Sequence, residues 1–126
     1  MGLTYSAYIG APDTTPRPTD LPSFDPLYGF QNGRPERRMV ATTQEMQAAG
    51  LEAKDRDYCA HKLIDLMQCR KDAFPWTVAC SHKVHEYEQC EFDDYVLRMK
   101  EYERERRLRE RSKRKSAMVQ TEALGN

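Results

Sequence analysis

Four cysteines are the residues of this 126-residue chain whose types and spacing point to chemistry. Thiols can form disulfides, hold a metal ion or exchange with other thiols. The four fall into two matched pairs, each with nine intervening residues: Cys59 with Cys69, and Cys80 with Cys90. The apolar positions inside each pair also repeat, so that Leu63 and Leu66 correspond to Val84 and Tyr87.

The spacing of the cysteines selects among these chemistries. Ten positions along an α-helix span about 15 Å, whereas the Cα atoms of a disulfide lie within about 7 Å of each other. A helical segment therefore cannot close a disulfide between its own two cysteines. The short connection from Cys69 to Cys80 indicates an antiparallel pair of helices. We predict the disulfides Cys59–Cys90 and Cys69–Cys80, because the opposite pairing would require parallel helices.

Two other interpretations of the cysteines are a zinc site and reduced thiols in a cytosolic protein. His82 and His85 lie close to Cys80, which keeps zinc as an alternative. Zinc sites usually use shorter C-x2–4-C or H-x3–5-H spacings, so the nine-residue gaps do not fit. A thioredoxin-like redox function has no support, because no C-x-x-C motif is present. We expect no metal and no cofactor.

Helices must position these cysteines. An apolar repeat at i, i+4 and i+7 predicts a helix from about residue 53 to residue 70 or 71, carried by Cys59, Leu63 and Leu66. Pro75 lies in the connection and prevents one continuous helix. A second helix begins near Trp76 or Thr77, and it can be long because residues 76–124 contain no Gly or Pro.

A shorter helix is expected before the cysteines, over about residues 43–49. Thr42 and Glu45 fit a capping box, and Gly50 fits a helix stop. Before this helix, six of the seven prolines precede residue 36, so residues 1–35 are predicted to form an extended arm. Spaced aromatic residues would let the arm anchor on a partner, whereas the alternative is a mobile tail; they are Tyr5, Tyr8, Phe24, Tyr28 and Phe30.

Charge is concentrated near the C-terminus. Residues 98–115 carry 10 basic and 4 acidic side chains, although the whole chain has a formal net charge of zero. Ion pairs along one helix are expected for Glu101–Arg104, Glu103–Arg107, Glu105–Arg109 and Glu110–Arg114. This segment is predicted to be solvated or bound to an acidic partner or an anionic surface, with Arg104, Arg107 and Arg111 as candidate contacts.

The sequence therefore predicts an all-α fold. It is a disulfide-stapled antiparallel helical hairpin with an extended Pro-rich N-terminal arm and a long charged C-terminal helix. We divide the chain into residues 1–41 (arm), 42–52 (short helix and linker), 53–96 (hairpin) and 97–126 (charged helical extension and tail).

Several function classes are disfavoured. No catalytic motif stands out, so we expect that the chain is not an enzyme. No apolar run is long enough to span a bilayer, and we see neither a secretory signal nor an Arg-rich presequence. A nucleic-acid contact through residues 104–115 is weakened by interleaved acidic residues and by few aromatic residues for stacking, so we expect no nucleic acid partner.

The paired C-x9-C hairpin resembles the coiled-coil-helix-coiled-coil-helix family of the mitochondrial intermembrane space. Within it, other stretches resemble the B18 accessory subunits of mitochondrial complex I, the NADH:ubiquinone oxidoreductase. That resemblance covers about residues 36–110, and the stretches that carry it are residues 39–42, 56–61, 74–75, 94–101 and 103–108. The cysteines combined with the charged helical run are much more specific than the cysteine spacing alone.

The resemblance implies a non-catalytic structural or assembly subunit, held peripherally on the intermembrane-space side of the inner membrane among other membrane-arm subunits. It also implies import through an oxidative relay that forms the disulfides, with apolar residues beside Cys59 or Cys80 as docking elements. The alternative is an intermembrane-space assembly factor or chaperone for another respiratory complex. Finally, the opening M-G-x-x-x-[ST] pattern predicts myristoylation of Gly2.

Overall fold

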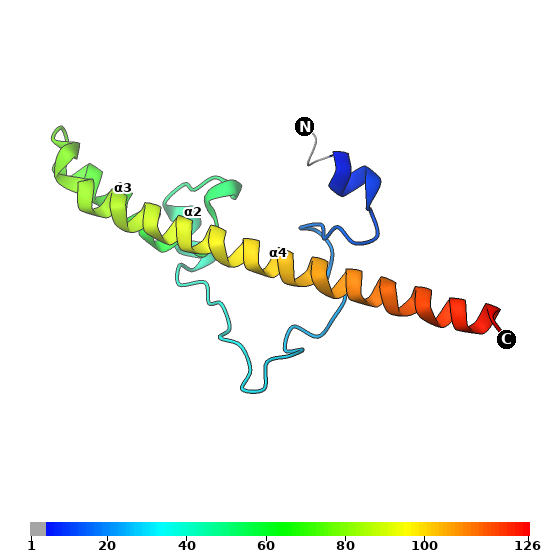
Figure 1. The fold of residues 1–126 in the computed structure, drawn as a ribbon. Helices are drawn as coiled ribbons and strands as arrows, with labels where there is room; N and C mark the ends of the chain where they lie inside the picture. The colour runs from blue at the N-terminus through cyan, green and yellow to red at the C-terminus, as the bar shows by residue number, and fades with distance from the viewer. Residues whose placement is uncertain (1–4) are drawn as a thin grey trace. The chain divides into compact units, whose positions relative to one another are not determined.

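A computed structural model describes residues 5–126, and within that range the protein is all-α with no β-strand (Figure 1). The three α-helices are α2 (Thr43–Ala48), α3 (Ala60–Ala73) and α4 (Ser81–Leu124). One π-helical turn and two 3-10 turns complete the helical elements, at Ser6–Gly10, Ala53–Asp55 and Thr77–Cys80. None of the described helices is both long enough and apolar enough to cross a membrane.

The chain divides into two compact units. One unit is the hairpin unit, residues 35–97, which contains α2, α3 and the first part of α4. The other combines the N-terminal arm up to residue 34 with residues 98–126 of the C-terminal segment; we call it the arm unit. The four-segment division made from the sequence stays a prediction.

Helix α2 forms where the capping signals predicted it. The Thr42 hydroxyl accepts a hydrogen bond from the Glu45 backbone N–H at 3.2 Å, and the Glu45 carboxylate accepts one from the Thr42 N–H at 3.1 Å. These two bonds satisfy N–H groups that a helix start leaves without partners. Gly50 ends the helix with a φ of 69°, a left-handed conformation that favours glycine.

Helix α3 begins later than predicted. We expected it from about residue 53, but Ala53–Asp55 form a separate 3-10 turn and α3 starts at Ala60. The cause is local, because the Asp57 carboxylate accepts a hydrogen bond from the Cys59 backbone N–H at 3.0 Å. Such a side-chain bond to a backbone N–H two residues later favours a turn over a helix. Cys59 therefore stands just outside the first turn of α3 rather than inside it.

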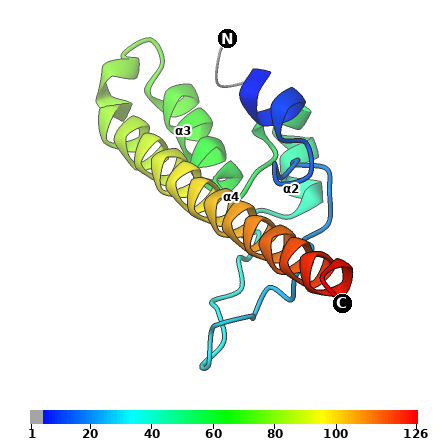
Figure 2. The same ribbon diagram turned by 45° about the vertical axis from the view of Figure 1, so that its right-hand side comes forward.

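A small apolar core holds α2 against the start of α3. Its buried members are Ala41, Met46, Leu51 and Ala60, with Ala49, Leu63 and Ile64 packed against them. Leu66, one turn further along α3, is also buried. Figure 2 shows α3 lying along the first part of α4, with a turn between them at one end of this hairpin.

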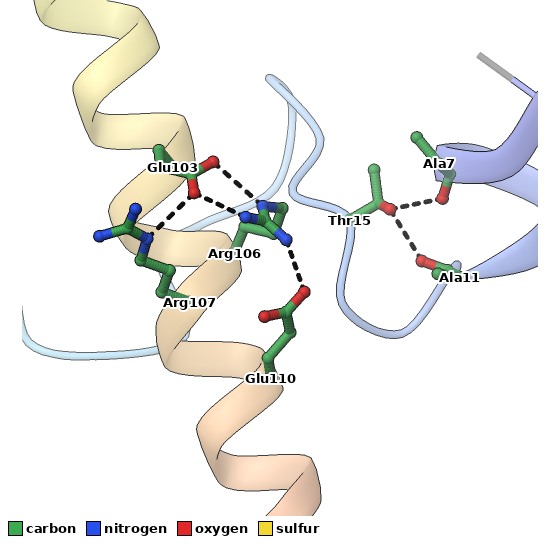
Figure 3. Close-up of polar contacts among 7 residues, drawn as sticks. All are labelled: Ala7, Ala11, Thr15, Glu103, Arg106, Arg107 and Glu110. Atoms are coloured by element: carbon green, nitrogen blue, oxygen red, sulfur yellow. Dashed lines mark hydrogen bonds and ion pairs between the residues drawn. The ribbon is translucent and has the colours of Figure 1, made fainter. Parts of the chain in front are cut away.

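The arm is less uniformly extended than predicted. Ser6–Gly10 form a π-helical turn, a position where no proline opposes a helix, since the first proline is Pro12. The Thr15 hydroxyl lies within hydrogen-bonding distance of the carbonyl oxygens of Ala7 and Ala11 and so closes this turn (Figure 3). Thr15 is buried, whereas most of the arm that follows is exposed.

Candidate interaction site

Both predicted disulfides are present in the hairpin. Cys59 is bonded to Cys90 with a Cα–Cα distance of 5.9 Å, and Cys69 to Cys80 with a distance of 6.0 Å. The first cross-link joins the start of α3 to α4, and the second closes the end of the hairpin near the turn. A two-helix unit buries too little apolar area to be stable alone. Closing the 59–90 loop adds roughly 3–4 kcal/mol in the chain-entropy treatment of disulfides.

Two acidic side chains lie beside the sulfur of Cys59. One carboxylate oxygen each from Asp57 and Glu91 lies within 4.8 Å of the Cys59 sulfur. Metal ions bind cysteine as a thiolate, and the Cys59 sulfur is committed to a disulfide. We therefore assign no metal site to this group. His82 and His85, the histidines that kept zinc as an alternative, are both exposed, and the sulfur of nearby Cys80 is bonded to Cys69.

Tyr87 takes its electrostatic character from the same surroundings. Burial raises the pKa of Tyr87 to about 12, and the negative charge and hydrogen bond of Glu91 act in the same direction. Asp57 and Asp55 contribute further negative charge. Because a phenolate here would be both desolvated and repelled, the neutral phenol is strongly favoured. Tyr87, which corresponds to Leu66 in the cysteine repeat, is half-buried.

Arg37 is a residue that the sequence patterns did not single out. Its guanidinium carbon lies 3.8 Å from the centroid of the Tyr58 ring, and it forms an ion pair with the carboxylate of Asp94. Asp94 is buried in α4. Arg37 therefore ties the segment before α2 to α4 within the hairpin unit. A planar cation that stacks and pairs in this way is a role for which lysine is a poor substitute.

The charged part of α4 carries a ladder of ion pairs in the arm unit. The Glu103 carboxylate accepts hydrogen bonds from Arg106 at 2.6 Å and from Arg107 at 3.0 Å (Figure 3). Arg106 also donates to the Glu110 carboxylate at 2.6 Å. The hydrogen bond from Arg106 is the largest influence on Glu103, and with Arg107 it lowers the pKa of that carboxyl to about 2. The predicted pair Glu103–Arg107 is therefore present.

Other predicted pairs rearrange because the arm supplies partners. Glu105–Arg109 forms at 3.0 Å as predicted. Glu101 instead pairs with Arg34 of the arm, and Glu110 pairs with Arg106 rather than with Arg114. The sequence reasoning considered only neighbours along the helix, so it missed these partners.

The arm is attached to α4 through Glu105 and Arg109. The Ser23 backbone N–H donates to the Glu105 carboxylate at 2.8 Å. Arg109 donates to the Ser23 hydroxyl at 3.0 Å and to the Thr15 carbonyl oxygen at 3.2 Å. The side chains of Glu105 and Arg109 are only 12% and 13% exposed. Burial alone would raise the pKa of Glu105, but the hydrogen bonds from Ser23 and Arg109 outweigh it and lower that pKa.

A second attachment lies at Arg104, one of the predicted partner contacts. Its guanidinium donates to the carbonyl oxygen of Tyr28 and lies 5.0 Å from the centre of the Phe30 ring. Arg34 lies at the same distance from that ring. Phe30 thus lies against two cations, while the residue remains 42% exposed.

The remaining predicted partner contacts are mostly exposed side chains. Tyr5 and Tyr8 are exposed. The ring centres of Phe24 and Tyr28 lie 6.1 Å apart. Arg107 and Arg111 are exposed on α4. Gly2 lies outside the described residues. The structure therefore brings Phe30, Tyr28 and Arg104 together, and contacts of any of these residues with other proteins stay predictions.

Sequence reasoning missed one conspicuous surface. The connection between α3 and α4 exposes three large apolar side chains, namely Phe74, Trp76 and Val78. We call these three residues, with the loop that carries them, the hairpin tip. The available signal is the run of large apolar residues around Pro75; in the sequence, this segment supplies Pro75 as a break between helices and residues 74–75 for the family resemblance.

The chain is similar in sequence to a known protein family. The sequence model of the family described as NADH-ubiquinone oxidoreductase B18 subunit (NDUFB7) matches residues 40–102, half of the chain, including all four cysteines. The beta subcomplex subunit 7 of NADH dehydrogenase [ubiquinone] 1 from Bos taurus is 52% identical over 108 residues, which cover 86% of this chain and 78% of the relative. The chain belongs to the B18 family of complex I subunits.

More distant relatives of the B18 family extend the match. The subunit of the same name from Caenorhabditis elegans is 47% identical over 121 residues, covering 93% of this chain and 98% of the relative. The one from Arabidopsis thaliana is 39% identical over 82 residues, 61% of this chain and 78% of the relative. As a B18 family member, the chain is a non-catalytic accessory subunit of mitochondrial complex I, and it binds other subunits of that complex.

Proposed function

We propose that this chain is a structural and assembly subunit on the intermembrane-space face of the membrane arm of complex I, bound peripherally to the inner membrane. The observation that carries the proposal is the doubly disulfide-bonded hairpin inside the region shared with the B18 family. Structural disulfides persist in oxidising compartments and are rare where thiols are kept reduced. Family membership favours a resident subunit over an assembly factor for another complex.

In this proposal the hairpin is a rigid clip, and other surfaces contact the neighbouring subunits. The ladder on α4 and the arm aromatics offer charged and apolar contacts. Arg107 and Arg111, with Tyr5 and Tyr8, are exposed and are the first residues to test as partner contacts.

Formation of the disulfides would coincide with import. An oxidative relay would trap the chain after it crosses the outer membrane, since an oxidised hairpin cannot unfold easily to leave. The apolar side chains beside Cys59 or Cys80 would dock to the receptor of that relay, in particular Leu63 and Leu66 or Val84 and Tyr87. Acylation of Gly2 would add a weak membrane tether, because one acyl chain alone gives marginal binding.

The experiment replaces Cys59 by Ser in cells that lack the wild-type chain. The expected result is a lower steady-state level of the chain and less assembled complex I, while the complex that does assemble keeps its normal turnover. Asp65→Ala, an exposed change on the same helix, is the matched control and should leave both levels unchanged. Normal accumulation and full assembly of the Cys59→Ser variant would contradict the structural role.

The location is tested separately by protease treatment of intact mitochondria and of mitochondria with an opened outer membrane. Degradation is expected as soon as the outer membrane is opened. Degradation only after the inner membrane is solubilised would place the chain on the other side and overturn the proposed location. Intact-protein mass spectrometry of the same material tests Gly2, since an unmodified N-terminus would refute acylation.

A further inference from the structure

The hairpin tip is an apolar surface that the hairpin itself leaves uncovered. Three large apolar side chains lie within five consecutive positions, at Phe74, Trp76 and Val78. They are 78%, 77% and 81% exposed, respectively. Cys80, two residues after Val78, is fully buried because its sulfur is bonded to Cys69 inside the hairpin. The loop stands at the end of the hairpin where α3 turns into α4 (Figure 2). The exposed fractions show that the described residues leave these three side chains largely uncovered.

The loop that carries the tip is held in shape. The Cys69–Cys80 disulfide closes a loop of 11 positions directly behind it. The Trp76 backbone N–H donates to the Ala73 carbonyl oxygen at 2.7 Å, and the Ala79 N–H donates to the Trp76 carbonyl oxygen at 3.2 Å. A surface organised in this way loses little conformational entropy on binding. The internal hydrogen bonds also lower the cost of moving this backbone out of water.

The charges beside the tip have a net positive sign. Arg70 and Lys71 lie in the last turn of α3, and Lys83 lies in the first turn of α4. Asp72 is the acidic residue between Arg70 and Lys83 in the sequence, and it accepts a hydrogen bond from Gln68. Lys83 also lies 3.5 Å from the Glu86 carboxylate. Cationic side chains therefore flank the apolar hairpin tip on both sides in the sequence.

We propose that the hairpin tip inserts into the headgroup region of an anionic lipid bilayer. Trp prefers the interface between headgroups and acyl chains, where its ring is buried and its N–H stays hydrated. Phe74 and Val78 add apolar area beside it, and the cations of Arg70 and Lys71 meet the negative lipid headgroups. A tip of three exposed side chains suits a deformable surface, and the insertion is shallow because one turn of chain reaches no further.

This inference deepens the proposed function by naming a lipid surface as a partner. It rests on the proposed function only for the identity of the membrane, which is then the inner mitochondrial membrane. The test uses the purified, oxidised full-length chain with lipid vesicles. It therefore does not depend on complex I assembly, and its failure would leave the proposed subunit role standing.

Trp76 is the single tryptophan of the chain, so its fluorescence reports on the tip alone. The probe is a phosphatidylcholine vesicle with added cardiolipin. The expected result is a blue shift of the Trp76 emission and quenching by lipids brominated near the headgroup end of the acyl chain. The shift should weaken when cardiolipin is omitted or when salt is raised, because part of the binding is electrostatic.

Two variants make the test specific. Val78→Asp keeps the fluorophore and should lower the vesicle affinity about tenfold or more, because it replaces inserted apolar area by a charge. Leu124→Asp changes a similarly exposed apolar residue, 88% exposed at the end of α4 against 81% for Val78, and should leave the affinity unchanged. Both positions are on the surface, and protection of all four cysteines from alkylation verifies that each variant is folded.

Three results would overturn the inference. The first is vesicle binding without any change in Trp76 emission, which would assign binding to another part of the chain. The second is an equal loss of affinity in both variants. The third is the absence of vesicle binding together with a photo-crosslink from position 78 to a protein in assembled complex I, which would make the tip a protein contact.

Discussion

Tyr87 is the side chain whose ionisation the hairpin alters most clearly. Burial is the main cause, and the charge of Glu91 adds to it, so its pKa rises from 10.0 to about 12. The neutral form is favoured in the folded state. The stability that this provides is complete below pH 10, and it is lost as the pH rises from 10 towards 12.

An ultraviolet titration of the oxidised chain tests this value. The difference in phenolate absorbance between the wild type and Tyr87→Phe isolates one of the seven tyrosines. This difference should appear with a midpoint near pH 12. The free energy of unfolding of the wild type should decline over the same interval relative to that of the variant. A difference signal centred near pH 10 would contradict the described environment of Tyr87.

The pKa of Glu103 is shifted in the opposite direction, downward. Its hydrogen bond from Arg106, aided by Arg107, lowers its pKa from 4.5 to about 2. A lowered pKa means that the stabilising ion pairs are present above pH 4.5 and are lost as the pH falls towards 2. Local helix content around residue 103 should therefore decrease only in strong acid.

Carbon NMR of the Glu103 carboxyl measures that pKa directly. Arg106→Gln should move it upward, towards 4.5, because the principal hydrogen bond is removed. Arg111→Gln removes an exposed arginine from the same helix and should leave it unchanged. Equal shifts in the two variants would indicate a general charge effect instead of the specific contact.

Among the elements, α2 depends on its capping box. Thr42→Ala removes the hydroxyl that accepts from Glu45 and should lower the free energy of unfolding by about 1 kcal/mol, as measured by urea denaturation. Thr43→Ala, one position into the helix, is the control and should cost much less. Equal losses would show that the cap contributes little beyond helix propensity.

The arm depends on Arg109, which joins the Ser23 hydroxyl, the Glu105 carboxylate and the Thr15 carbonyl oxygen. Arg109→Gln should accelerate hydrogen exchange of the Ser23 backbone N–H roughly tenfold, because the loss of a charged partner weakens its acceptor Glu105. Arg111→Gln should not alter that rate. Unchanged exchange in Arg109→Gln would mean that the arm is held elsewhere.

These elements show what a sequence can specify. The matched cysteine spacing and the Thr42–Glu45 motif act over short or regular distances, so they predicted the disulfides, the hairpin and α2. The late start of α3 escaped prediction because a single Asp57 hydrogen bond overrides the apolar period. The Ser23–Glu105 contact joins residues 82 positions apart, and no local pattern encodes such a pairing.

The hairpin tip was missed for a different reason. Apolar side chains are normally assigned to a core, and sequence periodicity does not reveal whether a loop between two helices is covered. Only the structure shows that Trp76 and its neighbours stay exposed while Cys80 is buried.

For the whole molecule, the central claim is that an oxidised hairpin is the folded core of a complex I subunit. The small apolar cluster around Met46 and Ala60 and the two disulfides belong to the same unit of the chain. Cross-linking restricts the unfolded chain, so the unit stays folded with little apolar burial. The charged surface and the arm are then available for contacts with other subunits.

The most direct measurement is thiol alkylation of intact mitochondria without reduction, followed by native separation and mass spectrometry of complex I. The chain should migrate with complex I, with all four cysteines unlabelled and with peptides that join Cys59 to Cys90 and Cys69 to Cys80. Alkylated cysteines in the assembled complex, or migration of the chain apart from complex I, would contradict the account.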